Sequence, residues 1–238
     1  MRTPIKTTSW LVLSIVAPSV PVVNEALRSR HVKSVDGHGK AERTRERLME
    51  AATLEFAMYG IAGARVDRIA NLAKANKSLI YEYFGNKEQL FQSVLQRHLA
   101  EVYQTVHFSA VDLPDYATKL FDFAMDHPHL MRLVMWNGLE KQPHWPLDDS
   151  SSLDAQVRAI RRQQEQGQMD ATYPPEFLLT LIITLASAWT AANPLGMSIA
   201  PDADAKRASL RAAIASAVQR LCMPSPRAGD QPLGVGQL

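Results

Sequence analysis

Cysteine is almost absent from this sequence, because Cys222 is the only one among 238 residues. A single cysteine excludes an internal disulfide and a cysteine-based zinc site. Long apolar runs are also lacking, since none reaches the roughly 20 residues that a membrane-spanning helix needs. We therefore expect a cytoplasmic protein without a cofactor, without a metal ion and without a membrane among its partners.

Charged residues are few, at 21%, beside 46% apolar residues, and this balance excludes a wholly disordered chain. The length fits one or two domains with a sizeable core. The net charge of +2 hides an asymmetry: residues 1–87 hold 14 Lys and Arg against 8 Asp and Glu, and residues 88–238 hold 12 against 16. A basic front of about +6 before a rear of about −4 is typical of chains whose front meets a polyanion.

Residues 10–23 are the only candidate for a targeting segment. Pro18 and Pro21 interrupt this apolar run, and no clear small-residue cleavage site follows it. We therefore do not expect export. Residues 1–38 are expected to be a disordered basic arm, and residues 224–238 a disordered tail.

Three successive helices are predicted behind this arm. The first covers residues 42–59, where apolar residues recur on one helix face until Gly60 ends it. A short second helix begins near Val66, and a third begins at Asn76, a good N-cap residue, and ends at Gly85. Two short helices behind a longer one are the layout of a DNA-reading helix-turn-helix.

The third helix presents two different faces. Ile80 and Phe84 stand four residues apart and point inward, so Ser78 and Glu82 point outward. Such an outward face can enter a major groove, where base edges are read by hydrogen bonds and apolar contacts. A solvated surface explains the spacing equally well. Cations that could neutralise phosphates flank this helix, namely Arg43, Arg45, Arg47 and Lys87.

Residues 64–91, ARVDRIANLAKANKSLIYEYFGNKEQLF, preceded by AATLEFAMYG at 51–60, resemble the DNA-binding domain of TetR-family transcriptional regulators. The resemblance covers about residues 41–100. It implies an all-α, TetR-like fold: a three-helix DNA-binding domain over 39–87 with its helix-turn-helix at about 65–84, a connecting helix over 88–106, and a helical effector-binding and dimerisation domain over 107–223.

The resemblance also implies roles for single residues. The positions that match base-reading ones lie in the first turns of the third helix, and those that match phosphate-binding ones lie around it. The expected DNA-binding residues are Arg65, Asn76, Lys77, Ser78, Leu79, Tyr81, Glu82, Tyr83 and Lys87.

Three positions depart from the family pattern. Arg65 replaces the usual Thr or Ser cap of the second helix, so Gly63 or Ala64 is expected to serve as the cap. Lys74 replaces a frequent turn glycine, and a left-handed backbone there would cost about 1 kcal/mol more than with glycine. Tyr83 replaces a frequent histidine and keeps a hydrogen-bond donor.

The rear of the chain reads as helices near 115–126, 128–140, 152–166, 174–193 and 204–222, with a surface loop over 141–152. The segment 177–192 is apolar nearly all round, which predicts a helix buried on every side. In the resembled family the last two helices pair with those of a second subunit; the alternative is that they complete a monomeric core. The expected interface residues are Leu181, Leu185, Trp189, Leu210, Ile214 and Leu221.

The remaining helices are expected to enclose a small apolar or amphipathic effector. Ordinary core packing is the competing interpretation for each candidate residue. His127 and His129 flank Pro128 as H-P-H, but no partner at metal-ligand spacing is apparent, so no metal site is expected. The candidate pocket residues are Phe121, Met125, Met131, Met135, Trp136 and Trp189.

These features predict a homodimeric repressor, associated with the nucleoid, that a small molecule releases from a palindromic double-stranded operator. An enzyme is not expected, because the sequence holds no nucleophile elbow, phosphate-binding loop, HExxH motif or paired carboxylates. The alternative is a helical ligand-binding or scaffold protein whose helix-turn-helix no longer binds DNA. Salt separates the two, because DNA affinity falls steeply with salt when phosphates are neutralised.

Overall fold

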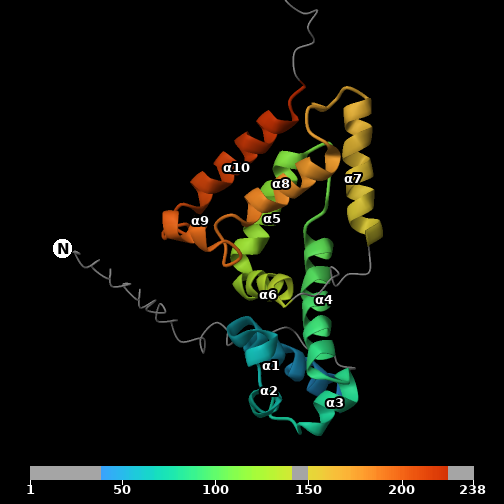
Figure 1. The fold of residues 1–238 in the computed structure, drawn as a ribbon, viewed down its shortest axis with the longest axis vertical. Helices are drawn as coiled ribbons and strands as arrows, with labels where there is room; N and C mark the ends of the chain where they lie inside the picture. The colour runs from blue at the N-terminus through green and yellow to red at the C-terminus, as the bar shows by residue number, and fades with distance from the viewer. Residues whose placement is uncertain (1–38, 141–149, 225–238) are drawn as a thin grey trace, which may run out of the picture. The chain divides into compact units, whose positions relative to one another are not determined.

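A computed structural model describes residues 39–140 and 150–224, and within these ranges the regular structure is entirely α-helical (Figure 1). The all-α fold class is therefore confirmed. The expectations for residues 1–38 and 141–149 and for nearly all of the tail lie outside the described residues. The helices are α1 (Lys40–Gly63), α2 (Val66–Leu72), α3 (Ser78–Phe84), α4 (Lys87–Thr105), α5 (Leu113–Asp126), α6 (Pro128–Leu139), α7 (Ser150–Glu165), α8 (Pro175–Ser187), α9 (Pro194–Ile199) and α10 (Arg207–Cys222).

The first four helices share one apolar core. Leu48 and Phe56 of α1, Ile69 of α2, Ile80 of α3 and Phe91 of α4 are fully buried. Phe56 and Phe91 meet edge to face, with ring centroids 5.2 Å apart. Burial of each such side chain stabilises the fold by about 1.5–3 kcal/mol, so α2 and α3 are held on α1 and α4 despite their shortness.

Gly60 interrupts α1 as its position in the sequence predicts. Its φ of 67° and ψ of −177° lie outside the helical region, and only a short turn continues to Gly63. The helix begins at Lys40, two residues before the predicted start. The stop at Gly60 therefore separates the long regular part of α1 from the link to α2.

In the second half of the chain, α5 packs against both α8 and α10 (Figure 1). Phe121, Ile182 and Ile214 supply buried apolar side chains from these three helices. Arg207 at the start of α10 donates from Nε to Asp122 Oδ1 at 2.9 Å and from Nη1 to Asp126 Oδ1 at 2.7 Å. Charge-assisted bonds of this kind fix the register of α10 along α5.

The predicted helix over 174–193 is too long. It ends at Ser187, and turns follow over residues 188–192. Asn193 then caps a further helix by accepting from Leu195 N at 3.2 Å, and Pro194 fits the first position of that helix. This short helix, α9, was missed. The predicted start of α10 at residue 204 is also wrong, since the helix begins at Arg207, and α7 already begins at Ser150.

Candidate functional site

Helix α3 shows the two faces predicted for a recognition helix. Ile80 is fully buried and Phe84 is 7% exposed, whereas Ser78, Tyr81 and Glu82 are exposed. The helix begins at Ser78 and its N-cap residue is Lys77, so the N-cap predicted at Asn76 is displaced by one residue; Asn76 Oδ1 still accepts a hydrogen bond from Ser78 N at 3.0 Å. A polar surface is therefore displayed on a helix whose other side is fixed in the core.

The turn between α2 and α3 has the left-handed backbone considered for Lys74. Its φ is 50°, and no other residue apart from glycines has a positive φ in the described ranges. Holding a non-glycine residue there costs on the order of 1 kcal/mol. Lys74 is exposed, so its ammonium group stands at the corner of the turn.

The two charged residues expected to approach bases, Lys77 and Glu82, differ in their ion pairing. Lys77 Nζ lies 2.9 Å from Asp67 Oδ1 of α2, and this hydrogen bond raises the lysine pKa. Glu82 has no ion-pair partner among the described residues, so the pairing with Lys77 or Lys87 that would explain it as a surface residue is not observed. Glu82 therefore presents an unpaired, exposed carboxylate.

The expected phosphate-binding residues differ in their contacts and in their exposure to solvent. Lys87 is the first residue of α4, and its Nζ donates to Ala64 O at 3.4 Å and Ala62 O at 3.5 Å. Tyr81 is exposed, whereas Tyr83 and Leu79 are half-buried and pack against the core. Tyr81 thus stands nearer to solvent than Tyr83 and Lys87, which are both half-buried.

Neither Gly63 nor Ala64 caps α2, so that expectation is wrong. Arg65 occupies the N-cap position, and its backbone N–H donates to Glu55 Oε1 of α1 at 2.8 Å. The Glu55 side chain is nearly buried and also accepts from Arg68 Nε at 2.7 Å. The Arg68 guanidinium in turn lies over the Tyr59 ring, 4.2 Å from its centroid. A carboxylate on another helix therefore supplies the cap that the local sequence lacks.

Glu55 and Arg68 were not identified from the sequence. The available signal was a glutamate at position 55 beside Phe56 on an otherwise apolar stretch of the first helix, where a buried charge needs a partner.

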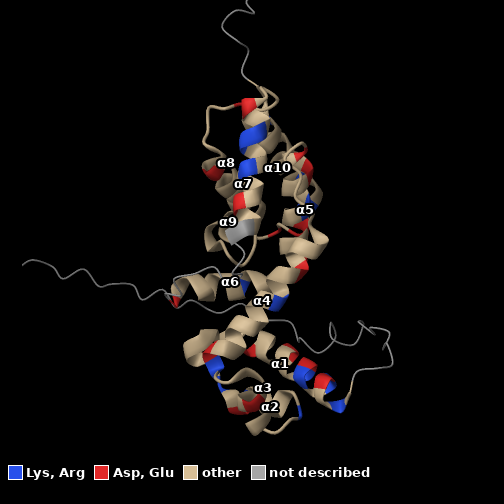
Figure 2. Ribbon diagram, turned by 90° about the vertical axis from the view of Figure 1, so that its right-hand side faces the viewer, with Lys and Arg blue, Asp and Glu red and all other residues tan. Residues whose placement is uncertain are grey.

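Both signs of charge line the first half of α1 (Figure 2). Arg43, Arg45 and Arg47 are exposed there, and the Arg45 guanidinium lies 5.6 Å from the Phe84 ring centroid of α3. Arg47 donates to the Thr44 hydroxyl at 3.2 Å. The cations next to α3 are therefore held on the same core as the recognition helix.

Trp136, one of the candidate pocket residues, packs on α1. Its Nε1–H donates to Ala57 O at 3.4 Å, and Arg132, one turn earlier, donates from Nε to the same oxygen at 2.5 Å. One turn later, Glu140 Oε1 accepts from Ala62 N at 3.2 Å. One side of α6 therefore binds the backbone that the break at Gly60 leaves unpaired.

The other candidate pocket residues lie in the helical domain. Phe121 is fully buried, and Met125, Met131, Met135 and Trp189 are half-buried, with Trp189 beyond the end of α8. In addition, Gln156 of α7 is only 7% exposed, and its Oε1 has no hydrogen-bond partner. Tyr116 is buried on α5, and desolvation raises its pKa to about 12. The domain thus contains polar groups among apolar ones.

The exposure of residues on α8 and α10 changes the set of residues expected at the dimer interface. Ile214 is 1% exposed within a single chain, so it belongs to the chain's own core and cannot form a contact surface. Within a single chain one side of α8 is left open, because Phe177 is 51% exposed and Ile183 is 36% exposed. Half-buried residues border these faces, namely Leu181, Leu185, Leu210 and Leu221.

No helix in the described ranges is long and apolar enough to cross a membrane. The arrangement of α1–α4 is that of a helix-turn-helix DNA-binding protein, and α5–α10 continue the same compact unit. Comparison with known proteins gives the family. Residues 48–94 match the model of bacterial regulatory proteins of the tetR family, and residues 112–220 match the tetracyclin repressor-like C-terminal domain.

The relatives agree with these matches. The chain is 37% identical over 185 residues to the HTH-type transcriptional repressor SCO4008 of Streptomyces coelicolor, covering 76% of this chain and 95% of that protein. It is 34% identical to the repressor NicS of Pseudomonas putida, over 59% of this chain and 71% of NicS. The crystal structure of SCO4942 from Streptomyces coelicolor aligns with a TM-score of 0.68 at 35% identity, covering 76% of this chain and 99% of that one.

The chain belongs to the TetR family of transcriptional regulators. It is therefore a DNA-binding regulator of transcription and not an enzyme.

Proposed function

We propose that the protein is a homodimeric repressor that leaves a palindromic operator when a small apolar or amphipathic molecule binds its helical domain. The observation that carries the proposal is the exposed polar face of α3, which is fixed on a core shared with α1 and α4. Repressor names among the relatives support the direction of control. Its domains are assigned to residues 39–87 for DNA binding, 88–106 for the connecting helix and 107–223 for effector binding and dimerisation.

We assign base reading to the start of α3 and phosphate binding to its surroundings. Ser78 and Glu82 are exposed enough to reach base edges, and Lys77 can do so when it exchanges Asp67 for DNA. Tyr81 and Lys87 are assigned to phosphates, where the N-terminus of α4 adds its positive dipole. The same assignment extends to Arg65, Asn76, Leu79 and Tyr83.

We place the dimer contact on the outer faces of α8 and α10. An exposed aromatic side chain at Phe177 and an exposed Ile183 leave apolar area in water that a second copy would cover. Replacing Phe177 with Asp puts a charge on this face without disturbing the core, so it is expected to yield a folded monomer. Leu195→Asp on α9, which is 67% exposed, is the matched control and should remain dimeric.

Release requires that effector binding be felt at the helix-turn-helix. The contact of α6 with the end of α1 is the connection we infer, since Arg132 and Trp136 both bind Ala57 O. An effector can shift the operator-binding equilibrium only by its differential affinity for the two arrangements. The unpaired Gln156 Oε1 favours an effector that carries an O–H or N–H donor beside its apolar part.

The decisive experiment is selection of genomic DNA fragments by the purified full-length protein, followed by sedimentation of the complex. We expect one palindromic site bound by two chains, with an affinity that falls steeply with salt. No DNA binding at any salt concentration would instead indicate a scaffold, and sequence-independent binding would contradict an operator-specific repressor. Repeating the selection with candidate effectors tests release.

A further inference from the structure

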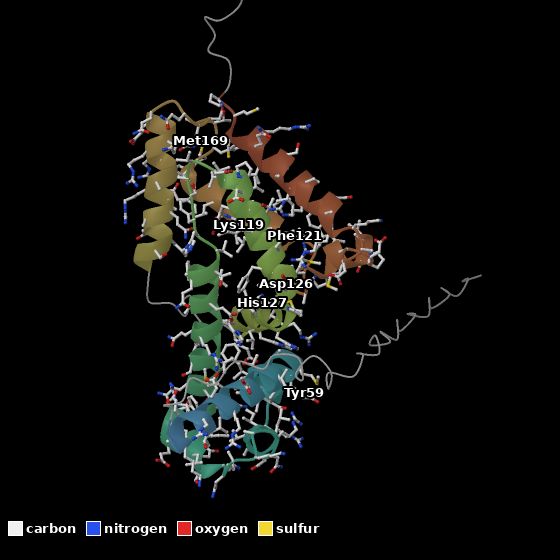
Figure 3. The ribbon with its side chains drawn as sticks, turned by 180° about the vertical axis from the view of Figure 1, so that it is seen from behind. Tyr59, Lys119, Phe121, Asp126, His127 and Met169 are labelled. Atoms are coloured by element: carbon white, nitrogen blue, oxygen red, sulfur yellow. The ribbon has the colours of Figure 1, made fainter. Side chains whose placement is uncertain are left out.

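Two histidines from different parts of the chain face one carboxylate where α4 meets the α5–α6 junction. His98 and Glu101 lie three residues apart on α4, and His127 is the residue between α5 and α6, next to Asp126 (Figure 3). Glu101 Oε2 lies 3.8 Å from His98 Nδ1, and Glu101 Oε1 lies 3.7 Å from His127 Nε2. The H-P-H pattern lacks an evident partner in the sequence, and Glu101 is that partner in the fold.

The hydrogen bond at the other side of the His127 ring fixes where its hydrogen lies. His127 Nδ1 is 2.7 Å from Phe123 O, and a carbonyl oxygen only accepts, so Nδ1 carries the hydrogen. The ring also stacks on Phe123, with centroids 3.9 Å apart, which holds its orientation. In neutral His127, Nε2 therefore points a bare lone pair toward Glu101.

His98 has the corresponding arrangement. The Thr53 hydroxyl of α1 donates to Met49 O at 2.9 Å, so its oxygen accepts from His98 Nε2 at 3.1 Å. His98 Nδ1 is buried without a hydrogen-bond partner. Three electron-pair donors, two ring nitrogens and a carboxylate, thus face one another with no hydrogen between them.

We propose that His127 and Glu101 form a proton-operated link between α4 and the α5–α6 junction. When a proton from solvent binds Nε2 of His127, the new N–H donates to Glu101, and a contact between two acceptors becomes a charge-assisted hydrogen bond. The link joins the helix that follows the recognition helix to the two helices that, under the proposed function, surround the effector. The regulatory role of this link rests on the proposed function.

The other histidines of this region, His98 and His129, have lowered pKa values. Burial lowers the pKa of His98 on α4, and Arg97, His127 and His129 lower it further against the opposing effect of Glu101. Burial also lowers the pKa of His129 on α6, with a smaller contribution from Arg132.

The nearest carboxylate on α5 is already engaged. Asp126 accepts from Arg207 of α10 at 2.7 Å, which ties this carboxylate to α10. Glu101 Oε1 lies 3.7 Å from His127 Nε2, so it is the carboxylate that we expect to receive the new N–H of His127.

The test measures the thermal midpoint of the full-length protein at about pH 5.8 and about pH 8, on either side of ordinary histidine titration. We expect the thermal midpoint of wild type to exceed that of His127→Gln, and this excess to be about 2–4 °C larger at the lower pH. The reason is that only protonated His127 donates a hydrogen bond to Glu101. In a Glu101→Gln background this pH-dependent difference should vanish. His107→Gln, at an exposed histidine outside the cluster, is the control and should show no such difference from wild type.

An equal difference at both pH values, or one that persists in Glu101→Gln, would overturn the link. A second experiment repeats the thermal measurement with zinc chloride added. In the described part of the chain no three His, Cys, Asp or Glu side chains form a group that could hold a metal ion. If zinc stabilised the protein only when both His127 and Glu101 are present, these residues would bind a metal ion in place of a proton, and the proposal would be overturned. The thermal readout needs no DNA, so its failure is distinct from failure of the proposed repressor function.

Discussion

The indole ring of Trp136 on α6 packs directly on Gly60 of α1, so closely that an added Cβ at Gly60 would lie 2.8 Å from two ring carbons. Gly60 also has a φ of 67°, in the region that favours glycine. Backbone conformation and close approach thus both require glycine here. The residue that ends the regular part of α1 is also the point where the helical domain contacts the DNA-binding domain.

Gly60→Ala is predicted to destabilise the protein by roughly 2–5 kcal/mol, adding about 1–2 for the left-handed backbone and about 1–3 for the displaced ring. Chemical denaturation measures the loss. Gly138→Ala on α6 is the matched control, because nothing lies within 4 Å of its added Cβ. There a helical Gly→Ala exchange should stabilise by about 0.5–1 kcal/mol. Equal effects of the two substitutions would contradict the Trp136–Gly60 contact.

Glu55→Gln is predicted to loosen α2 on α1. The nearly buried carboxylate accepts from Arg65 N and Arg68 Nε, and the neutral amide replaces one charged acceptor oxygen with a donor. We expect a loss of about 1–3 kcal/mol in unfolding free energy and weaker operator binding. Glu50→Gln, at an exposed position of the same helix, should leave both unchanged. Because glutamine keeps one acceptor oxygen, wild-type stability in Glu55→Gln would mean that the negative charge of Glu55 does not stabilise the contact between α1 and α2.

Acid is predicted to reduce stability through His98. Burial lowers its pKa in the folded chain, so as pH falls below about 6.5 the unfolded chain binds the proton first. The stability is therefore lost as the pH falls toward the pKa of His98 in the folded chain, and it is fully present above the pKa of His98 in the unfolded chain. Denaturation midpoints measured between about pH 5 and pH 8 should fall less steeply in His98→Gln than in wild type. An identical slope would show that His98 charges as easily when folded.

The sequence predicts the DNA-binding domain well because its signals are local. Periodic apolar residues and the stop at Gly60 each act within one or two turns, and the structure has both, while Asn76 binds Ser78 N one residue before the N-cap position. The left-handed backbone at Lys74 is the conformation that the family's frequent turn glycine implied for this position.

The errors concern partners that are distant in the chain. Glu55 caps α2 from 10 residues away, and Trp136 reaches Ala57 across 79 residues. The apolar segment around Phe177 looks buried on every side because composition does not show which face a single chain leaves open. For the same reason Ile214 reads as an interface residue when it fills the core of its own chain. Tertiary packing decides these points, and periodicity does not report it.

Lys87→Ala is predicted to weaken binding to all DNA sequences alike and to reduce the salt slope by about one unit, as expected for a lost phosphate contact. The ammonium group of this lysine lies within 3.5 Å of the backbone oxygens of Ala62 and Ala64, so it is held at the end of α1. Lys119→Ala on α5 removes an equal charge far along the chain and should leave the slope unchanged. A slope in Lys87→Ala equal to wild type would remove Lys87 from the DNA-binding surface.

The exposed, unpaired carboxylate of Glu82 yields the most specific prediction. Phosphates repel a carboxylate on the outward face of α3, so Glu82 contributes affinity only if it finds a donor, and the cytosine amino group is the major-groove donor that suits it. We therefore expect a C·G pair at one matching position of each half-site. Glu82→Ala should lose that preference, worth about 1–3 kcal/mol per half-site, while affinity for other sequences holds or rises. Operator selection from random DNA with wild type, Glu82→Ala and the exposed control Glu88→Ala decides the matter, since identical preferred sequences from all three proteins would exclude base reading by Glu82.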